Sequence, residues 1–140
     1  MVEAPVSAAV WGINENRWGW ASVSQGKHDF YQDSHGFLEQ GVVDAIAPMI
    51  YWPVAPHRGE RLDFASLVAD HVANRHGRHV YAGISAGLSY VQILDCIRVA
   101  RAEGAQGVVI FDYSQIRPHL DQLKKDVFGE KAHPPSMDWR

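Results

Sequence analysis

Apolar and polar positions along this chain follow two alternating patterns: short continuous apolar runs, and longer segments with an apolar residue every three or four positions. The short runs have the composition of buried parallel strands. They predict strands over residues 6–13, 42–51, 79–84 and 107–112. The longer segments have the spacing of amphipathic helices. They predict helices over residues 30–40, 64–76, 89–103 and 118–128.

Glycine, aspartate and proline mark several of the predicted boundaries. Gly41, Gly77 and Gly104 stand where the helical patterns stop, as is typical of helix C-termini. Asp63 precedes its helix in the position of an N-cap. Pro118 suits the first turn of the last helix, because its missing N–H has no partner there.

Strict alternation of strands and helices predicts an α/β fold whose parallel strands are joined by right-handed crossovers. Two architectures fit, an open doubly wound sheet and part of a barrel. A complete barrel takes about 250 residues, so about four βα units form half of a (β/α)8 TIM-type barrel. Residues 1–128 are predicted to form this partial barrel, and residues 129–140 a loosely ordered C-terminal tail. Pro48, inside the second strand, predicts a bulge.

Composition and charge narrow the classes of function. The 140 residues, 46% hydrophobic and 21% charged, suffice for one globular domain with its own core. A net charge of -3 gives no reason to expect a nucleic acid or a membrane surface as partner. Cys96 is the only cysteine, which excludes an intrachain disulfide, and we predict that it is a small core residue. No apolar stretch reaches membrane-spanning length, and the start, MVEAPVSAAVWG, lacks the basic leader of a signal peptide.

The second predicted strand ends in an aromatic pair, Tyr51 and Trp52, after the apolar run GVVDAIAPMI. Strand alternation puts Met49 and Tyr51 on the same face, above small alanines. The aromatic pair then lies at the carboxyl edge of the sheet, where barrel enzymes place their sites. Because flat rings stack against the apolar face of a pyranose, Tyr51 or Trp52 is predicted to bind sugar, with packing against the wall as the alternative.

The first predicted strand runs through Trp11 to Asn14 and continues into a long polar loop that contains Trp18 and Trp20. A loop of this length in a compact domain is usually functional or disordered. Its tryptophan and asparagine content favours a rim that grips an extended glycan. The alternative is a lid anchored by its tryptophans without any ligand.

Asp112 ends the fourth predicted strand and is the best-placed carboxylate at the same edge. Hydrolysis of a glycosidic bond usually needs two carboxyl groups, one acid and one base or nucleophile. Asp112 fits one of these two catalytic roles. It fits equally a residue that hydrogen-bonds sugar hydroxyls, or a structural residue that caps a helix. Glu15 is a second carboxylate near the mouth, whereas Asp44 begins its strand at the opposite end and is interpreted as structural.

Residues 83–87, Gly-Ile-Ser-Ala-Gly, match the G-x-S-x-G pattern of serine hydrolases and place Ser85 between a strand and a helix. Asp112 and then His119 or His133 follow in the order of such enzymes. Against this interpretation, the next helix begins several residues late, and no HGGG-type segment precedes the serine. A serine hydrolase is therefore the weaker alternative.

The eight histidines are dispersed, and no pair has metal-binding helical spacing with a third ligand in reach. His71 lies beside the apolar face of its predicted helix. No glycine-rich phosphate loop follows any strand, which argues against a nucleotide site. We expect neither a metal nor a cofactor.

Three segments of the chain resemble the second half of the glycoside-hydrolase-like family 10 barrels, also described as family 10 glycosylhydrolase proteins. The segments are YQDSHGFLEQGVVDAIAPMIYWP, RHVYAGIS and QGVVIFDYSQI. The positions that match the family pattern are Asp33, Phe37, Leu38, Gly41, Val42, Val43, Asp44, Pro48, Met49, Ile50, Tyr51, Trp52, Val80, Tyr81, Gly83, Gly107 and Phe111. The match covers most of residues 5–116, and the Pro-Met-Ile-Tyr-Trp block is its most specific part.

The resemblance implies strands five to eight of a TIM-type barrel that hydrolyses glycans, with bacterial cell-wall polysaccharide as the substrate class. This chain lacks the family's earlier segment, in which a strand ends in paired aspartates, and Asp112 stands where a small residue is usual. Part of the catalytic apparatus is therefore expected outside this chain. The unpaired sheet edges are expected to be covered by a missing N-terminal half-barrel or by self-association.

These observations predict Asp112 as a catalytic carboxylate. The predicted substrate-binding residues are Trp11, Asn14, Met49, Tyr51, Trp52, Tyr81 and Ser85. A polysaccharide is the expected partner, and a location in the cell envelope or outside the cell follows if the full-length protein carries a signal upstream. The alternative to an enzyme is a truncated, non-catalytic piece that binds glycan.

Overall fold

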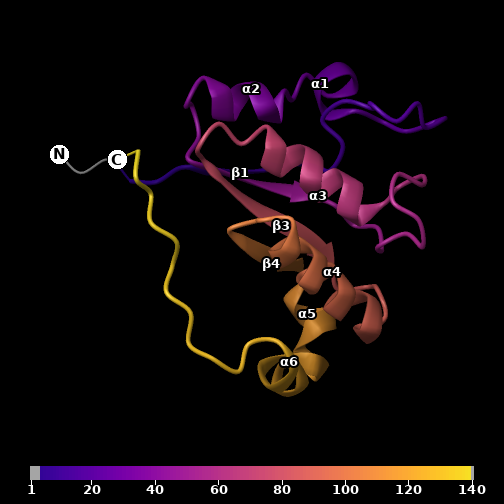
Figure 1. Cartoon of the computed structure of the whole chain (residues 1–140), viewed down its shortest axis with the longest axis vertical. Coiled ribbons are helices and arrows are strands. Elements are labelled where there is room, and N and C mark those ends of the chain that lie inside the picture. Colours follow the sequence, from indigo (N-terminus) through magenta and orange to yellow (C-terminus); the bar gives the residue numbers. More distant parts are fainter. Residues whose placement is uncertain (1–3, 140) are drawn as a thin grey trace.

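The computed structural model describes residues 4–139, and the expectations for residues 1–3 and 140 lie outside this described part. Its centre is a four-stranded, fully parallel sheet in the order β1-β2-β3-β4 (Figure 1). The strands are β1 (Ser7–Trp11), β2 (Ala45–Met49), β3 (His79–Ser85) and β4 (Gly107–Phe111). The four predicted strands are confirmed, with β1, β2 and β4 shorter than predicted.

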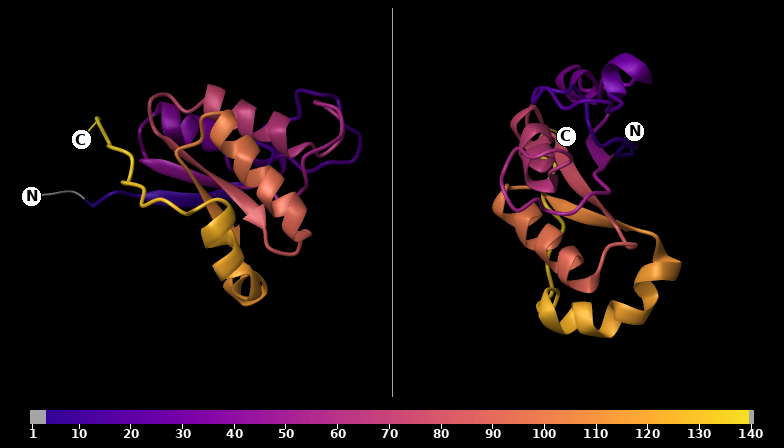
Figure 2. Two further views of the ribbon diagram at one scale, coloured as in Figure 1. Left: turned by 60° about the horizontal axis from the view of Figure 1, so that its bottom comes forward. Right: turned by 90° about the vertical axis from the view of Figure 1, so that its right-hand side faces the viewer.

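Helical segments follow each strand. They are α1 (Gly26–Asp29), α2 (Ser34–Glu39), α3 (Phe64–Ala73), α4 (Tyr90–Ala102), α5 (Tyr113–Ile116), the 3-10 turn η1 (Arg117–His119) and α6 (Leu120–Asp126). The two longest, α3 and α4, lie on the same side of the sheet (Figure 2). None of the helices in the described part has the length and apolar character needed to cross a bilayer.

Strand order distinguishes between the two architectures that the sequence allows. In a doubly wound sheet the order reverses at a switch point and helices cover both faces. Here the order follows the chain, and α3 and α4 cover one face of the sheet (Figure 2). The chain therefore forms four βα units that correspond to half of a (β/α)8 barrel.

Side chains along each strand alternate between a helix-covered face and an open face. Residues on the helix-covered face are almost fully buried and include Val10, Ile46, Val80, Ala82 and Ile84. The open face carries exposed residues that include Ser7, Ala9, Val109 and Phe111. In a closed barrel these positions fill the interior, so the open face is the inner wall of a half-barrel.

The core lies between the sheet and the covering helices. Phe64 and Val68 of α3 and Ile93 and Ile97 of α4 are fully buried and pack in one cluster with the helix-covered face. Cys96 belongs to this cluster, as predicted, and is fully buried. Burial raises the pKa of its thiol to about 12, because the thiolate would lose its hydration.

The central strands β2 and β3 approach closely at Gly83. A Cβ at this position would lie 2.4 Å from the carbonyl oxygen of Pro48, so only glycine fits without a backbone shift. The predicted bulge at Pro48 is wrong, because the register advances by three residues on both strands between Ile46↔Val80 and Met49↔Gly83. A bulge would need an extra residue on one strand.

Side-chain caps fix the starts of the two long helices. Asp63 is the N-cap of α3, as predicted, and accepts hydrogen bonds from the backbone N–H groups of Ala65 and Ser66. Ser89 begins α4 with a capping box, in which its hydroxyl and the Gln92 side chain each accept from the other residue's backbone N–H.

The helix predicted over residues 30–40 is present only as α2, because residues 30–33 are not helical and α1 ends before residue 30. Tyr31, between them, has a φ of 53°, in the left-handed region that interrupts a helix. Asp33 then caps α2 by accepting a hydrogen bond from the backbone N–H of Gly36.

The last helical region begins at Tyr113, five residues before the predicted start at Pro118. Asp112 causes the early start, because its carboxylate accepts a hydrogen bond from the backbone N–H of Gln115 and caps α5. Pro118 lies within η1, at the bend between α5 and α6.

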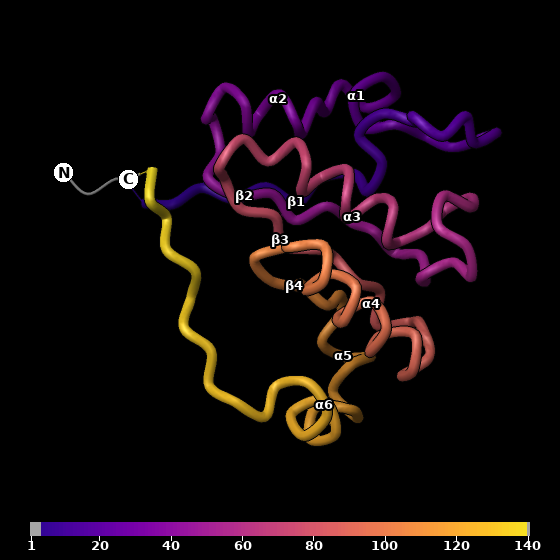
Figure 3. Tube along the Cα trace, viewed as in Figure 1, coloured from indigo at the N-terminus to yellow at the C-terminus, as the bar shows by residue number. Residues whose placement is uncertain are grey.

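The chain after α6 has no helix or strand in its described part and runs back toward the start of β1 (Figure 3). Its end is held by Trp139, whose indole Nε1 donates a hydrogen bond to Asp44 Oδ1 at 2.8 Å. The Trp139 ring also lies edge-on to His79 and beneath the Arg78 guanidinium. His79 Nε2 donates to the carbonyl of Ser136. The tail therefore crosses the N-terminal edge of the sheet, opposite the edge where the site is expected.

Candidate functional site

The register of the sheet brings several predicted site residues into neighbouring positions near the carboxyl edge. Trp11 pairs with Met49, Met49 with Gly83, and Gly83 with Val109. These four positions form one row across the sheet. Gly83 leaves its part of the row without a side chain, between larger neighbours.

The next row toward the edge contains a parallel pair of rings. Ser85 pairs with Phe111, and Tyr51 lies two residues beyond Met49, which places it beside Ser85. The Tyr51 and Phe111 rings are stacked, with centroids 6.0 Å apart and planes inclined by 10°. Burial raises the pKa of the Tyr51 phenol, so it stays protonated and is a donor at neutral pH. A pair of near-parallel aromatic rings therefore links the ends of β2 and β4.

A second aromatic group lies at the ends of β1 and β2. The Trp11 ring is 6.5 Å from that of Trp52, edge to face, and 5.0 Å from that of Phe30. Its indole N–H donates to the carbonyl of Ser24. Trp11 and Trp52 are half-buried against the core, so part of each ring packs against the wall.

The long loop after β1 is fixed by its own side chains. The Trp18 and Trp20 rings are stacked 4.5 Å apart, and the Asn16 amide both accepts from Trp20 N–H and donates to its carbonyl. The Trp20 indole donates to the carbonyl of Gly59, in the loop after β2. The two loops at the carboxyl edge are therefore linked.

Asn14 is not brought to the open face. It is only 2% exposed, and its side-chain oxygen accepts hydrogen bonds from both the backbone N–H and the hydroxyl of Ser34. Its amide donates to Asp33. Each of these hydrogen bonds fixes the start of α2, so the side chain has a structural role and no free group for a ligand.

Tyr81 lies on the inner face but away from the carboxyl edge, in the row of Gly107. Its ring occupies the space above that glycine, where a Cβ would lie 2.9 Å from the ring. Nε2 of His79 carries the ring proton, which it donates to the carbonyl of Ser136 in the tail. Nδ1 of His79 is therefore an acceptor, and the Tyr81 hydroxyl donates to it. Tyr81 therefore joins the inner wall to the tail.

Asp112 follows directly after Phe111, through a cis peptide bond, and is the carboxylate at the end of β4. Ser114 and the side chain and backbone of Gln115 donate hydrogen bonds to it, and these bonds hold its pKa below the usual value. A carboxyl group in this state is ionised at neutral pH. It is suited to act as a base, a nucleophile or a cap, and not as the proton-donating acid.

Glu15 and Asp33 share one lysine near the same edge. Lys27 Nζ lies 2.6 Å from Glu15 Oε1 and 3.4 Å from Asp33 Oδ2. The hydrogen bond from Lys27 lowers the pKa of Glu15. Burial alone would raise the pKa of Asp33, but hydrogen bonds from Gly36, Asn14 and Lys27 outweigh it. Neither carboxyl group is therefore poised to donate a proton.

Ser85 does not have the geometry of a nucleophile elbow. Its hydroxyl accepts a hydrogen bond from the backbone N–H of Gly87, and α4 begins only at Tyr90. Within residues 4–139, no hydrogen bond joins Ser85 to a histidine, and the His119 ring packs against Tyr90 instead. This geometry does not favour the serine-hydrolase alternative.

A buried polar network, missed from the sequence, lies between the β1 end and α3. His71 Nε2 is 3.0 Å from the carbonyl oxygen of Gly12, and His71 Nδ1 is 3.1 Å from His35 Nε2. Asp70 forms an ion pair with Arg17 of the long loop, and burial raises its pKa. The position of His71 beside an apolar helix face indicates burial, but nothing in the sequence identifies its partners.

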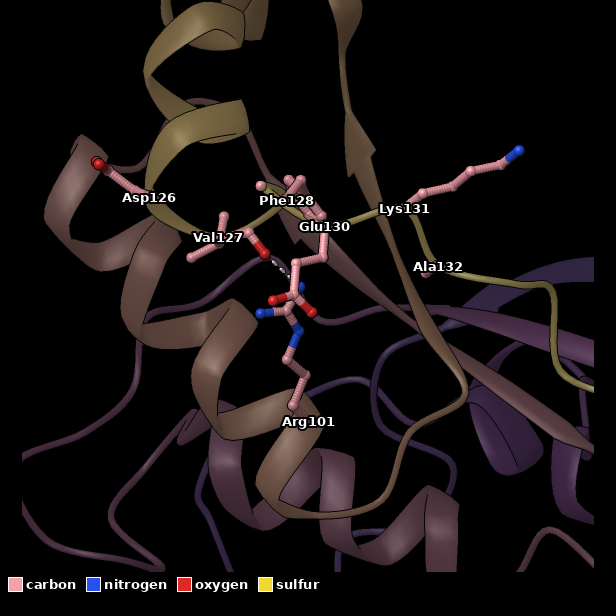
Figure 4. Close-up of a pocket in the computed structure, with 8 residues that line it drawn as sticks. Arg101, Asp126, Val127, Phe128, Glu130, Lys131 and Ala132 are labelled. Carbon is pink, nitrogen blue, oxygen red and sulfur yellow. Dashed lines mark hydrogen bonds between the residues drawn. The ribbon is translucent and has the colours of Figure 1, made fainter.

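The pocket at the end of α4 lies away from these residues (Figure 4). It has a volume of about 450 Å³ and is formed by Arg101 and the segment from Asp126 to Ala132. Arg101 donates a hydrogen bond to the carbonyl of Val127 and lies over the Phe128 ring. Through these contacts the Arg101 guanidinium attaches the start of the tail to α4. Among the described residues, no cluster of three or more histidine, cysteine or acidic side chains could hold a metal ion.

The fold and the edge residues define an α/β protein with a parallel β/α half-barrel and an aromatic carboxyl edge. A scan against models of known protein families gives no match, and a search of curated proteins finds no similar sequence.

Proposed function

We propose that this chain supplies the C-terminal half of a (β/α)8 glycoside hydrolase of the family 10 glycosylhydrolase type, and that it binds a polysaccharide, with bacterial cell-wall glycan as the substrate class. The observation that carries the proposal is the parallel pair of Tyr51 and Phe111 at the carboxyl edge of a half-barrel. The sequence resemblance, whose most specific block contains Tyr51 and Trp52, supports the same assignment.

Sugars are recognised by a combination of flat apolar and polar groups. The C–H faces of a pyranose stack on aromatic rings, and its hydroxyls need hydrogen-bond partners. Tyr51 and Phe111 offer the flat surface, while the Ser85 hydroxyl and the Asp112 carboxylate lie in neighbouring positions of the chain and sheet. One edge thus combines both requirements.

Hydrolysis needs an acid as well as a base or nucleophile. Because its pKa is held low, Asp112 suits the base or nucleophile role, which requires an ionised carboxylate. The acid, which protonates the leaving oxygen, then comes from the other half of the barrel. Without that acid the chain is a glycan-binding piece, which is the alternative function.

Binding is tested by titrating the protein with soluble, peptide-free glycan fragments of bacterial cell wall in a calorimeter. Tyr51→Ala and Phe111→Ala are each expected to raise the dissociation constant by about five- to tenfold, which corresponds to the free energy contributed by one stacked aromatic ring. Tyr31→Ala is the matched control, because the Tyr31 side chain is 92% exposed. Equal affinity of the Tyr51→Ala and Tyr31→Ala proteins would contradict the proposal.

Hydrolysis is tested by incubating the full-length protein, and this chain separately, with the same glycan and analysing new reducing ends. Asp112→Asn is expected to abolish cleavage, whereas Asp121→Asn, an exposed carboxylate on α6, leaves it unchanged. Binding without cleavage by either protein selects the glycan-binding alternative. Absence of both binding and cleavage removes the glycan assignment altogether.

A further inference from the structure

The two edge strands of the sheet have little protection in the described part; at the end of β1, the Gln32 side chain accepts a hydrogen bond from the backbone N–H of Trp11. Natural sheets shield their edges with charged residues, prolines or bulges, because an open edge pairs with other chains. The edge strands β1 and β4 have the sequences SAAVW and GVVIF, without a charged residue or a proline. Both edge strands therefore have the composition of central strands, which have a neighbouring strand on each side.

The β4 edge is also apolar on both of its faces. On the inner face, Val109 and Phe111 are 45% and 60% exposed. On the helix side, a groove of about 430 Å³ runs between β4 and α6. Its apolar lining includes Val108, Ile110, Ile116, Leu120, Leu123 and Phe128. A strand placed beside β4 would cover apolar surface on both sides of the sheet.

The groove also indicates where a further strand would pack, beside β4 and under α6. In a β/α barrel each helix packs across two adjacent parallel strands. In this chain α6 follows β4, the last strand of the sheet, so one of its two contacts is unfilled in the described part. The apolar groove is where the outward side chains of a following parallel strand pack.

We propose that a second copy of this chain closes the barrel. In this arrangement β1 of the copy pairs in parallel with β4, and a two-fold axis along the barrel repeats the contact between β4 of the copy and β1. Four strands from each copy give the eight of a closed barrel and leave no edge unpaired. The proposal rests on the half-barrel fold and does not depend on glycan binding.

The β1 strand suits this position. On the inner face it presents the small residues Ser7 and Ala9, which fit beside the larger Val109 and Phe111 of β4. On the helix side, the exposed Val6 and the small Ala8 are the residues available to fill the groove along α6. Small and large side chains thus alternate across the seam, as packed barrel interiors require.

Closure by a second copy would also change the site. Because all eight strands run in the same direction, the carboxyl ends of both sheets lie at one mouth. This mouth then carries two copies of Asp112 and two Tyr51–Phe111 ring pairs. Both copies of Asp112 are held ionised by the same hydrogen bonds, so the second copy adds rings and carboxylates for binding a glycan but does not supply the proton-donating acid.

The oligomeric state tests this inference. Light scattering during size-exclusion chromatography and sedimentation equilibrium, across a wide concentration range, are expected to give a dimer that dissociates on dilution. Val109→Lys and Leu120→Lys, on the two faces of the β4 edge, are expected to raise the dimer dissociation constant by at least about thirtyfold. Val91→Lys is the matched control, since this valine is exposed on α4, away from either edge. Circular dichroism checks that each variant is folded.

Each outcome bears on the inference. A wild-type monomer at all concentrations, or equal dissociation constants for Val109→Lys and Val91→Lys, overturns it. Open-ended oligomers overturn it as well, because they require pairing without closure. A monomer that still binds cell-wall glycan overturns the second copy but leaves the proposed function intact, with the other half of the barrel supplied by a different sequence.

Discussion

At the residue scale, the paired imidazoles of His35 and His71 show how a buried hydrogen bond fixes a proton. The carbonyl of Gly12 can only accept, so Nε2 of His71 carries the proton and donates to it. Nδ1 of His71 is then the acceptor, and His35 Nε2 is the donor. Both rings are neutral at pH 7, because their pKa values lie well below it. Burial, with a smaller contribution from the neighbouring charges for His35, lowers their pKa values to about 3 for His35 and about 4 for His71.

This network predicts acid sensitivity. Between pH 6.5 and 5 the unfolded chain protonates both histidines while the folded chain does not, so the free energy of unfolding falls as the pH falls. The expected loss is roughly 2 kcal/mol for each buried histidine over this interval. Urea unfolding at several pH values measures it. His71→Gln, which keeps a donor for Gly12, should show a smaller pH dependence than His57→Gln, an exposed control. Equal pH dependence in the two variants would refute this explanation.

At the element scale, one aspartate organises the loop between β2 and α3. The Asp63 carboxylate accepts backbone hydrogen bonds from Ala55 and Gly59 in the loop as well as from Ala65 and Ser66 in the helix. Burial would raise its pKa, but hydrogen bonds from the Ser66 hydroxyl and from the backbone N–H groups of Ala55, Gly59 and Ser66 lower it. The side chain thus fixes a helix start and the loop that receives the Trp20 indole.

Asp63→Ala is expected to lower the free energy of unfolding by about 2–4 kcal/mol, because four backbone donors lose their acceptor. Ser89→Ala, which removes the cap of α4, should cost only about 1 kcal/mol, since that cap is exposed. Denaturant unfolding of both variants gives the comparison. Losses of similar size would show that the additional loop bonds of Asp63 add nothing to stability.

The element pattern was predictable where it depends on local spacing. Apolar periodicity identifies four strands, and Asp63 and Ser89 mark the starts of two helices. The break at Tyr31 was not predictable, because it depends on a left-handed backbone conformation that a tyrosine rarely adopts. The early start of α5 was missed, although a cap was among the predicted roles of Asp112, because a helix of four residues shows no apolar periodicity.

The candidate site was predictable to the extent that it follows from strand ends. The positions of Met49, Tyr51 and Ser85 near one edge follow from strand alternation and register. The burial of Asn14 depends on Ser34, twenty residues away, so no local pattern reveals it. The same holds for the pairing of Tyr51 with Phe111, which lie on different strands.

At the scale of the whole molecule, the tail connects the last helix to the first half of the sheet. Trp139 contacts Asp44, Arg78 and His79, from the loop before β2 and the start of β3. These contacts hold the tail against the N-terminal edge of the half-barrel, opposite the aromatic carboxyl edge.

Trp139→Ala is expected to release the tail without loosening the sheet. Loss of the indole hydrogen bond and the cation–π contact should make the backbone of residues 130–139 mobile, with NMR order parameters below about 0.6. Trp18→Ala is the control, because Trp18 stacks on Trp20 in the loop after β1, at the opposite edge. Tail order parameters that are the same in both variants would show that Trp139 does not anchor it.

The burial of Cys96 gives the protein an internal reporter. A thiol with a pKa of about 12, inside the cluster between α4 and the sheet, is inert toward alkylating reagents while the fold is closed. As the chain has no other cysteine, every labelled molecule records one opening of this cluster. The labelling rate of the unmodified protein therefore measures how often α4 separates from the strands, and any ligand that holds them together slows it.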